Sequence, residues 1–181
     1  MSTSSWIYTG LAVIFVILAA VYISHLAGRL DRAHLKVEST RQALLTNLAH
    51  RSALAMEFAT LDGIDPEIAA SVRAAARLAR DEEVADSGWH EESVLTAAIT
   101  AAVMDEATLA AAERSGPAAL TDLASLCRRV QYSRRFHNDA VRQARELRAR
   151  FLARSLRLAG RAALPEYIDF DDSVPAPLER T

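Results

Sequence analysis

The sequence predicts an all-α protein in which an N-terminal transmembrane helix continues into an antiparallel four-helix bundle with long first and last helices. Three observations predict this fold. The chain holds 36 Ala and 22 Leu but only 6% aromatic residues, and this usage favours helices over sheet. An unbroken apolar run stands near the N-terminus, and a heptad pattern follows it. No alternation of strand and helix with a glycine-rich turn is present, which argues against a doubly wound nucleotide-binding fold.

The apolar run covers residues 6–23, and no charged side chain precedes Arg29. At about 1.5 Å per residue this run spans roughly 27 Å, close to the thickness of a hydrocarbon core. Trp6, Tyr8 and Tyr22 lie near its ends, where amphipathic aromatic rings favour the membrane interface. A cleaved signal peptide would need a basic leading region and a small-x-small cleavage site, and the run has neither in good form. A buried core helix would need a larger protein around it. We therefore expect a retained transmembrane helix.

The charges beside this helix predict its orientation. Arg29, Arg32 and Lys36 follow the apolar run, and only Asp31 opposes them. The positive-inside rule then places residues 29–181 in the cytoplasm, with the N-terminus outside the bacterial cytoplasmic (inner) membrane. The single cysteine, Cys127, agrees with a reducing compartment and excludes an intramolecular disulfide.

A heptad pattern runs on from the transmembrane segment without a strong helix breaker. We expect the first helix to reach about Leu61. One series of positions recurs every seven residues, and a second series lies three residues after each member of the first. The first series is Leu30, Val37, Leu44, Arg51 and Phe58, and the second is Ala33, Thr40, Asn47 and Leu54.

Breakers and caps divide the rest of the chain. Gly63 suits a helix end, and Asp65 with Pro66 suits a helix start. The predicted helices cover residues 66–86, 89–114 and 117–159, and their short connections favour antiparallel neighbours. The domains expected are a transmembrane anchor (1–28), a helical bundle (29–161) and an extended acidic tail (162–181).

The membrane-proximal half of this bundle holds only the first and last helices, so its apolar seam needs a cover. Two candidates remain for what packs on this seam, a second copy of the chain or the tail. The apolar tail residues are Leu164, Tyr167, Ile168 and Phe170.

Charge is segregated along the chain although the net charge is only −2. Residues 62–113 are strongly acidic, and residues 117–161 carry 11 Arg against three acidic residues. The two regions either complement each other internally or leave the basic helix to meet an anionic partner. We expect lipid headgroups near its last turns, at Arg148, Arg150, Arg154, Arg157 and Arg161. Nucleic acid is not an expected partner, because no aromatic residues interleave with these arginines and the domain as a whole is not basic.

Helix lengths bring a set of polar residues to one level of the bundle, namely Asn47, Arg51, His137, Asn138 and Asp139. We interpret this polar layer as one that fixes helix register. The alternative is a ligand- or metal-binding bundle that uses Arg51, Asn138 and Asp139. No Glu-x-x-His pair, P-loop or Ser/His/Asp arrangement is present. We therefore expect no enzyme activity, no catalytic residues, no metal site and no cofactor.

The stretch Arg134-Arg-Phe-His-Asn-Asp-Ala-Val-Arg142 resembles the signature of the LemA family, which typically reads Ala-Arg-Arg-Phe-Tyr-Asn-Asp-Ala-Val. Arg135, Phe136, Asn138 and Asp139 match that signature. The chain departs from the family pattern at His137, where the family has Tyr, and in lacking the second Tyr-Asn pair. The resemblance covers roughly residues 26–172 and implies a membrane-anchored helical bundle whose biochemical role is not established. It supplies no catalytic residues.

Together these features predict a membrane-anchored interaction or scaffold protein. Its expected partners are the lipid bilayer, unidentified membrane or cytoplasmic proteins, and a second copy of itself.

Overall fold

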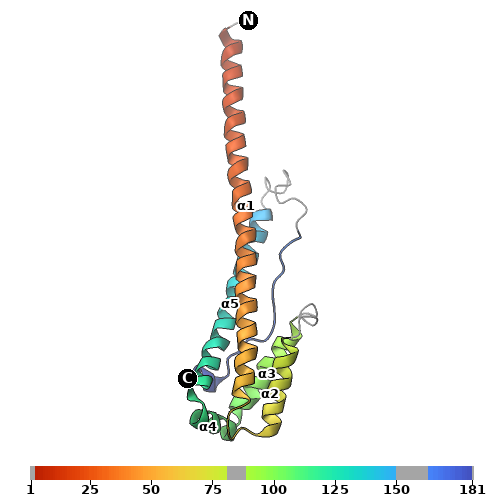
Figure 1. Cartoon of the computed structure of the whole chain (residues 1–181). Helices are drawn as coiled ribbons and strands as arrows, with labels where there is room; N and C mark the ends of the chain where they lie inside the picture. The colour runs from red at the N-terminus through yellow and green to blue at the C-terminus, as the bar shows by residue number, and fades with distance from the viewer. Residues whose placement is uncertain (1–2, 81–88, 150–162, 181) are drawn as a thin grey trace. The chain divides into compact units, whose positions relative to one another are not determined.

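The computed structural model describes residues 3–80, 89–149 and 163–180 (Figure 1). Over these residues the regular secondary structure is helical and no strand is present, which confirms the all-α prediction. The helices are α1 (Thr3–Phe58), α2 (Pro66–Leu78), α3 (His90–Met104), α4 (Glu106–Ser115), α5 (Pro117–Ala149) and α7 (Ala176–Glu179).

The chain divides into two compact units, and α1 and α5 each contribute to both. The first, here called the anchor unit, contains residues 1–38 and 140–166. The second, the bundle unit, contains residues 39–139 and 167–181. This division follows contacts in space, whereas the segments 1–28, 29–161 and 162–181 expected from the sequence follow composition along the chain.

The anchor unit contains the long apolar part of α1. An 18-residue window there has a mean hydropathy of 2.3, and none of it is buried. Two small clusters then join α1 to α5. Leu26 and Leu30 pack on Leu147, and a second cluster forms two turns of α1 beyond Leu30, from Val37, Ala140, Val141 and Ala144. A helix long and apolar enough to cross a membrane is therefore present, as the sequence predicts.

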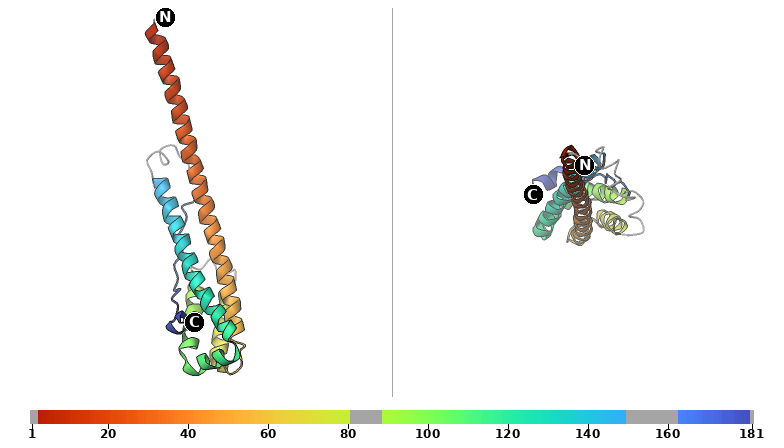
Figure 2. Two further views of the ribbon diagram at one scale, coloured as in Figure 1. Left: turned by 90° about the vertical axis from the view of Figure 1, so that its left-hand side faces the viewer. Right: turned by 90° about the horizontal axis from the view of Figure 1, so that it is seen from above.

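The bundle unit contains α2, α3, α4, α7 and parts of α1 and α5, whose ribbons Figures 1 and 2 show. All six described helices contribute side chains to one main core. The heptad prediction is confirmed in its first series, because all five of these residues are buried. The second series, from Ala33 to Leu54, is half-buried. Buried alanines are frequent in this core, and they let the helix backbones approach closely. The core's largest fully buried side chains are Phe58, Val72, Leu95, Val103, Leu123 and Leu178.

Helix α2 begins where its cap residues predict. The Asp65 carboxylate accepts hydrogen bonds from the N–H groups of Glu67 (2.8 Å) and Ile68 (3.3 Å), and Pro66 is the first helical residue. Gly63 lies in the left-handed region with φ +85°, as expected beyond a helix end. Helix α2 ends at Leu78, and the rest of the predicted helix 66–86 lies largely outside the described residues.

The single helix predicted over residues 89–114 is wrong. The chain forms α3 and α4, which are bent by 86° at Asp105. The Asp105 side chain accepts a hydrogen bond from the Thr108 N–H (2.8 Å) and thereby caps α4. No Gly or Pro stands at this break, so the apolar pattern on both sides of it predicted one continuous helix.

Helix α5 is described from Pro117 to Ala149, and the remainder of the predicted helix 117–159 lies outside the described residues. The part of its predicted stripe that is described is buried, namely Leu120, Leu123, Cys127, Val130 and Val141.

The C-terminal segment is extended from Ala163 to Pro175 and then forms the short helix α7, which the sequence analysis missed. Three residues of α5 hold it. Asn138 binds Ile168, Arg134 binds Asp172, and Arg128 donates to the carbonyl of Leu178 (2.7 Å). The residue numbers fall on α5 as they rise on the tail, so the segment runs antiparallel to α5.

Candidate functional site

The bundle unit contains a buried ion pair between α1 and α3. The side chain of Arg51 is only 2% exposed, and its Nη2 lies 2.5 Å from the Glu92 carboxylate. Arg51 also donates to the Thr96 hydroxyl (3.1 Å) and to the Glu92 carbonyl (3.2 Å). Its Nε has no hydrogen-bond partner among the described residues. The partners of the Arg51 guanidinium thus bind its two terminal nitrogens, Nη1 and Nη2.

Burial controls the electrostatics of this pair. Desolvation raises the pKa of Glu92 above its ordinary value, and the nearby charge of Arg51 opposes this rise without cancelling it. Burial likewise raises the pKa of the Cys127 thiol, so Cys127 behaves as a small apolar core residue rather than as a thiolate.

Thr96 joins the ion pair to the C-terminal segment. Its hydroxyl oxygen lies 2.6 Å from the carbonyl of Asp171 and 3.0 Å from that of Glu92, and the hydroxyl donates to one of them at a time. The N–H of Asp171 donates to Ser93 (3.0 Å). Both backbone groups of Asp171 are therefore bound by the first two turns of α3.

Two residues of the signature stretch hold the same segment from α5. Arg134 donates through Nε and Nη2 to the two carboxylate oxygens of Asp172, at 2.6 and 2.9 Å. Its hydrogen bonds to Asp172 raise the pKa of the Arg134 guanidinium further. The side-chain amide of Asn138 donates to the carbonyl of Ile168 and accepts from the N–H of Ile168, each at 2.9 Å. The amide of Asn138 therefore binds the backbone of Ile168 on both its polar groups, and this contact does not depend on the identity of the side chain at position 168.

Two apolar side chains of the segment are buried in the bundle unit. Ile168 and Phe170 are buried in a cluster with Leu44, Leu48 and Val130, and Trp89 packs against it. The Phe170 ring stacks on Trp89 with centroids 6.1 Å apart. The guanidinium carbons of Arg51 and Arg134 lie 5.9 and 5.7 Å from its centroid.

Of the apolar tail residues, Ile168 and Phe170 are buried in the bundle unit, whereas Leu164 and Tyr167 are exposed. In the described part of the anchor unit, the clusters that join α1 to α5 contain no residue of the tail, so what covers the membrane-proximal seam stays a prediction. Charge complementarity also exists inside the chain. Arg134 of the basic last helix forms ion pairs with Asp169 and Asp172 of the acidic tail. Complementarity between the last helix and the acidic middle helices stays a prediction.

The residues predicted to form a polar layer have separate partners in the described contacts. Arg51 pairs with Glu92, Asn47 donates to Ser133 (2.6 Å), and Asn138 binds Ile168. The buried His137 has its Nδ1 3.4 Å from the Thr40 hydroxyl. The remaining signature residues Arg135, Phe136 and Asp139 are exposed.

The partners of these residues were not predicted from the sequence. Glu92 gives a usable signal, because it lies three, four and seven residues before the buried Leu95, Thr96 and Ile99. A carboxylate in such a stripe requires a buried cation. Asp172 gives no comparable signal, because nothing in an extended tail fixes its register against a helix.

Of the predicted lipid-facing arginines, only Arg148 is described, and it donates to the Ala163 carbonyl (2.9 Å). Arg150, Arg154, Arg157 and Arg161 lie outside the described residues.

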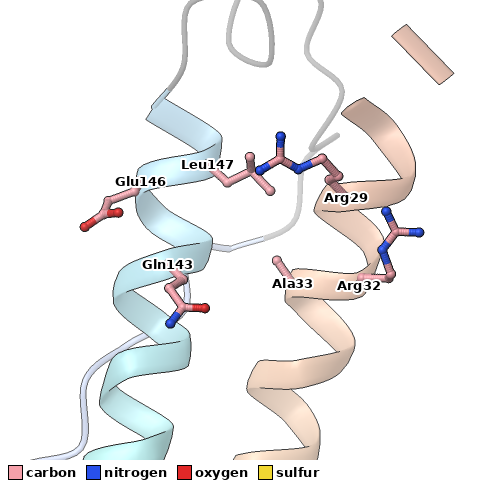
Figure 3. Close-up of a pocket in the computed structure, with 6 residues that line it drawn as sticks. All are labelled: Arg29, Arg32, Ala33, Gln143, Glu146 and Leu147. Atoms are coloured by element: carbon pink, nitrogen blue, oxygen red, sulfur yellow. The ribbon is translucent and has the colours of Figure 1, made fainter. Parts of the chain in front are cut away.

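Each unit also has an open pocket. In the anchor unit, a pocket of about 440 Å³ is lined by Arg29, Arg32, Ala33, Gln143, Glu146 and Leu147 (Figure 3). In the bundle unit, one of about 320 Å³ is lined by His50, Ala53, Leu54, Asp122, Ser125, Leu126 and Arg129. Within the described part of the chain, no three His, Cys, Asp or Glu side chains are grouped so that they could hold a metal ion. Comparisons with protein-family models, curated proteins and solved structures gave no match.

Proposed function

We propose that this chain is a single-pass protein of the bacterial cytoplasmic membrane that serves as an interaction or scaffold module of the LemA type, without catalytic activity. The observation that carries the proposal is the apolar window of α1, which has a mean hydropathy of 2.3 and no buried residue. Arg29, Arg32 and Lys36 follow it, so the positive-inside rule places the bundle in the cytoplasm and the N-terminus outside. In this proposal the bundle is an antiparallel four-helix bundle.

The proposed kinship with the LemA family is supported by the contacts that two residues of the signature stretch 134–142 make with the tail. Arg134 and Asn138 bind the tail through a bidentate ion pair and a paired amide contact. This gives a physical reason for the signature stretch on the last helix and the acidic tail to occur together in this chain.

A protein-binding role is supported by an aromatic pair on α5. Tyr132 and Phe136 are 53% and 64% exposed, and their spacing of four residues places them on one helix face. Arg135 beside them is also exposed. Exposed aromatic and arginine side chains are enriched at the energetic centres of protein interfaces. We propose that this face, defined by Tyr132, Arg135 and Phe136, binds a protein partner or a second copy of the chain.

Lipid contact through the basic end of the last helix belongs to the same proposal. Arg148 is the described member of that group, and it lies in the anchor unit. An anionic leaflet attracts such a cluster with roughly 1 kcal/mol per basic residue.

The alternative, a ligand- or metal-binding bundle at Arg51, Asn138 and Asp139, has less support. Arg51 and Asn138 bind groups of the chain itself. Elemental analysis of the detergent-purified protein tests this alternative, and a stoichiometric transition metal would favour it over an interaction module.

Two experiments test the proposal. A reporter active only in the cytoplasm, fused after Thr181, should be active, while a periplasm-specific reporter there should be silent. A photo-crosslinking amino acid at Phe136 should capture a discrete partner in cells, whereas the same group at the exposed Thr121 of α5 should not. Equal capture at both positions would contradict a specific interaction face.

A further inference from the structure

The pocket of the anchor unit lies just beyond the apolar run of α1. Its lining combines two arginines of α1 with the amide, carboxylate and apolar side chains of Gln143, Glu146 and Leu147 from α5 (Figure 3). Arg29 and Arg32 come six and nine residues after Ile23, the last residue of the run. At about 1.5 Å per residue they lie roughly 9 and 14 Å from its end.

Both side chains are able to reach the headgroups from there. The headgroup region adds roughly 5–8 Å to each side of the hydrocarbon core. Helical side chains incline toward the helix N-terminus, which for α1 is the direction of the apolar run. Arg32 follows this rule, because its Nη1 lies 3.9 Å from where a Cβ on Gly28 would be, one turn nearer to the run. Arg29 extends toward Leu147 across the mouth of the pocket (Figure 3).

The charge of the pocket favours an anion. Among the described residues, no carboxylate lies within ion-pair distance of Arg29 or Arg32. The acidic lining residue, Glu146, lies 3.8 Å from Arg142 on the same helix and points away from Arg29 (Figure 3). The guanidinium groups of Arg29 and Arg32 supply donors that match phosphate oxygens.

Part of the pocket lining is apolar. Leu147 and Ala33 line the pocket, and Leu147 is buried against Leu26 and Leu30, so that a glycerol backbone or the start of an acyl chain would meet carbon atoms beside Leu147. Guanidinium donors beside an apolar side chain, close to the apolar run of α1, match the adjoining phosphate and hydrocarbon groups of a phospholipid. We propose that this pocket binds the phosphate of an anionic phospholipid from the leaflet on the bundle side.

This inference rests on the proposed membrane anchoring. Native mass spectrometry of the full-length protein in detergent tests it with phosphatidylglycerol and phosphatidylcholine at equal concentration. Phosphatidylglycerol should be retained selectively. Arg29→Gln/Arg32→Gln should weaken its retention on the order of 10- to 30-fold, whereas Arg29→Lys/Arg32→Lys should keep most of it. The matched control is Arg41→Gln/Arg77→Gln, two exposed arginines of the bundle unit, and it should not change retention.

Equal retention of the two lipids, or the same loss in the control variant, would overturn the proposal. Displacement of the lipid by millimolar inorganic phosphate would show that the pocket binds free phosphate instead. A photoactivatable phosphatidylglycerol should crosslink to peptides holding residues 29–33 and 143–147 of the unmodified protein, and this needs no variant to fold. Loss of selectivity in a chain that stays in the membrane rejects the pocket alone, whereas a freely soluble chain rejects the anchoring.

Discussion

Asn138 of α5 binds both backbone groups of Ile168, donating to its carbonyl and accepting from its N–H, each at 2.9 Å. This contact fixes the start of the buried tail segment, whose far end is held by Arg134 through Asp172. The tail from Tyr167 onward is thus part of the bundle unit rather than an appendage to it.

Asn138→Ala should release the tail. The change leaves the N–H and carbonyl of Ile168 without these partners, at a local cost of about 1–3 kcal/mol. Amide hydrogen exchange at Ile168 and Phe170 should accelerate. Asn47→Ala is the matched control, because Asn47 binds Ser133 rather than the tail. Unchanged exchange in Asn138→Ala would show that apolar contacts alone hold the tail.

The two aspartates that face Arg134 should differ sharply on substitution. Asp172 is nearly buried and accepts two hydrogen bonds from Arg134, whereas the Asp169 side chain is 94% exposed and accepts one. Asp172→Asn should cost about 1.5–3 kcal/mol, because it breaks charge-assisted hydrogen bonds. Asp169→Asn should cost no more than a few tenths, as is usual for an exposed pair. Thermal unfolding of the full-length protein in detergent measures both, and equal losses would refute this ranking.

The ion pair of Arg51 and Glu92 should be strongly coupled. Glu92→Leu leaves a buried guanidinium without its carboxylate and should cost about 3 kcal/mol, and Arg51→Met should cost a similar amount. The double variant should lose far less than the sum of the single losses, because an apolar pair of similar volume avoids desolvation of both charges. A double-mutant cycle of unfolding free energies checks this. Additive losses would contradict the pairing.

The same pair should make stability depend on pH. The pKa of Glu92 is higher in the folded chain than its ordinary value of 4.5, so the folded chain binds this proton more tightly than the unfolded chain. The contribution of Glu92 is therefore fully present below pH 4.5 and is lost as pH rises through the folded-state pKa. The unfolding free energy of the wild type should rise relative to that of Glu92→Gln as pH is lowered from 7 toward 5. A constant difference over this range would show that the pKa is not raised.

The turn before α2 should not accept a side chain at Gly63. Its φ of +85° disfavours L residues, and an added Cβ would lie 3.2 Å from the Cβ of Ala111. Gly63→Ala should lower the unfolding free energy by about 1–2 kcal/mol. The neighbouring Asp62→Ala, at an exposed position, is the control. Equal unfolding midpoints for the two variants would contradict a strained turn.

Local patterns predicted much of this fold, and contacts distant in sequence account for what they missed. The heptad spacing identified Leu30, Val37 and Leu44 as buried, because helix periodicity alone selects a face. It also included Arg51, a charged residue whose burial makes sense only with Glu92 opposite. The bend at Asp105 was missed, because an aspartate serves as a cap only where the chain turns.

The candidate site was predicted less completely than the fold. Asn138 was singled out from the signature stretch, whereas Arg134, which begins that stretch, was not named as a candidate. Their partners Ile168 and Asp172 lie 30 and 38 residues away on an extended segment. An extended segment has no periodicity that would set its register against a helix. The partners therefore follow from tertiary packing and not from local sequence.

Membrane attachment by a retained α1 is the central claim, and one measurement tests it most directly. Cell membranes holding the native chain are washed with alkaline carbonate, and the intact mass of the protein in each fraction is determined. The protein should stay in the pellet, and its intact mass should include the apolar residues 6–23. A carbonate-soluble protein, or one shortened by removal of that segment, would contradict it.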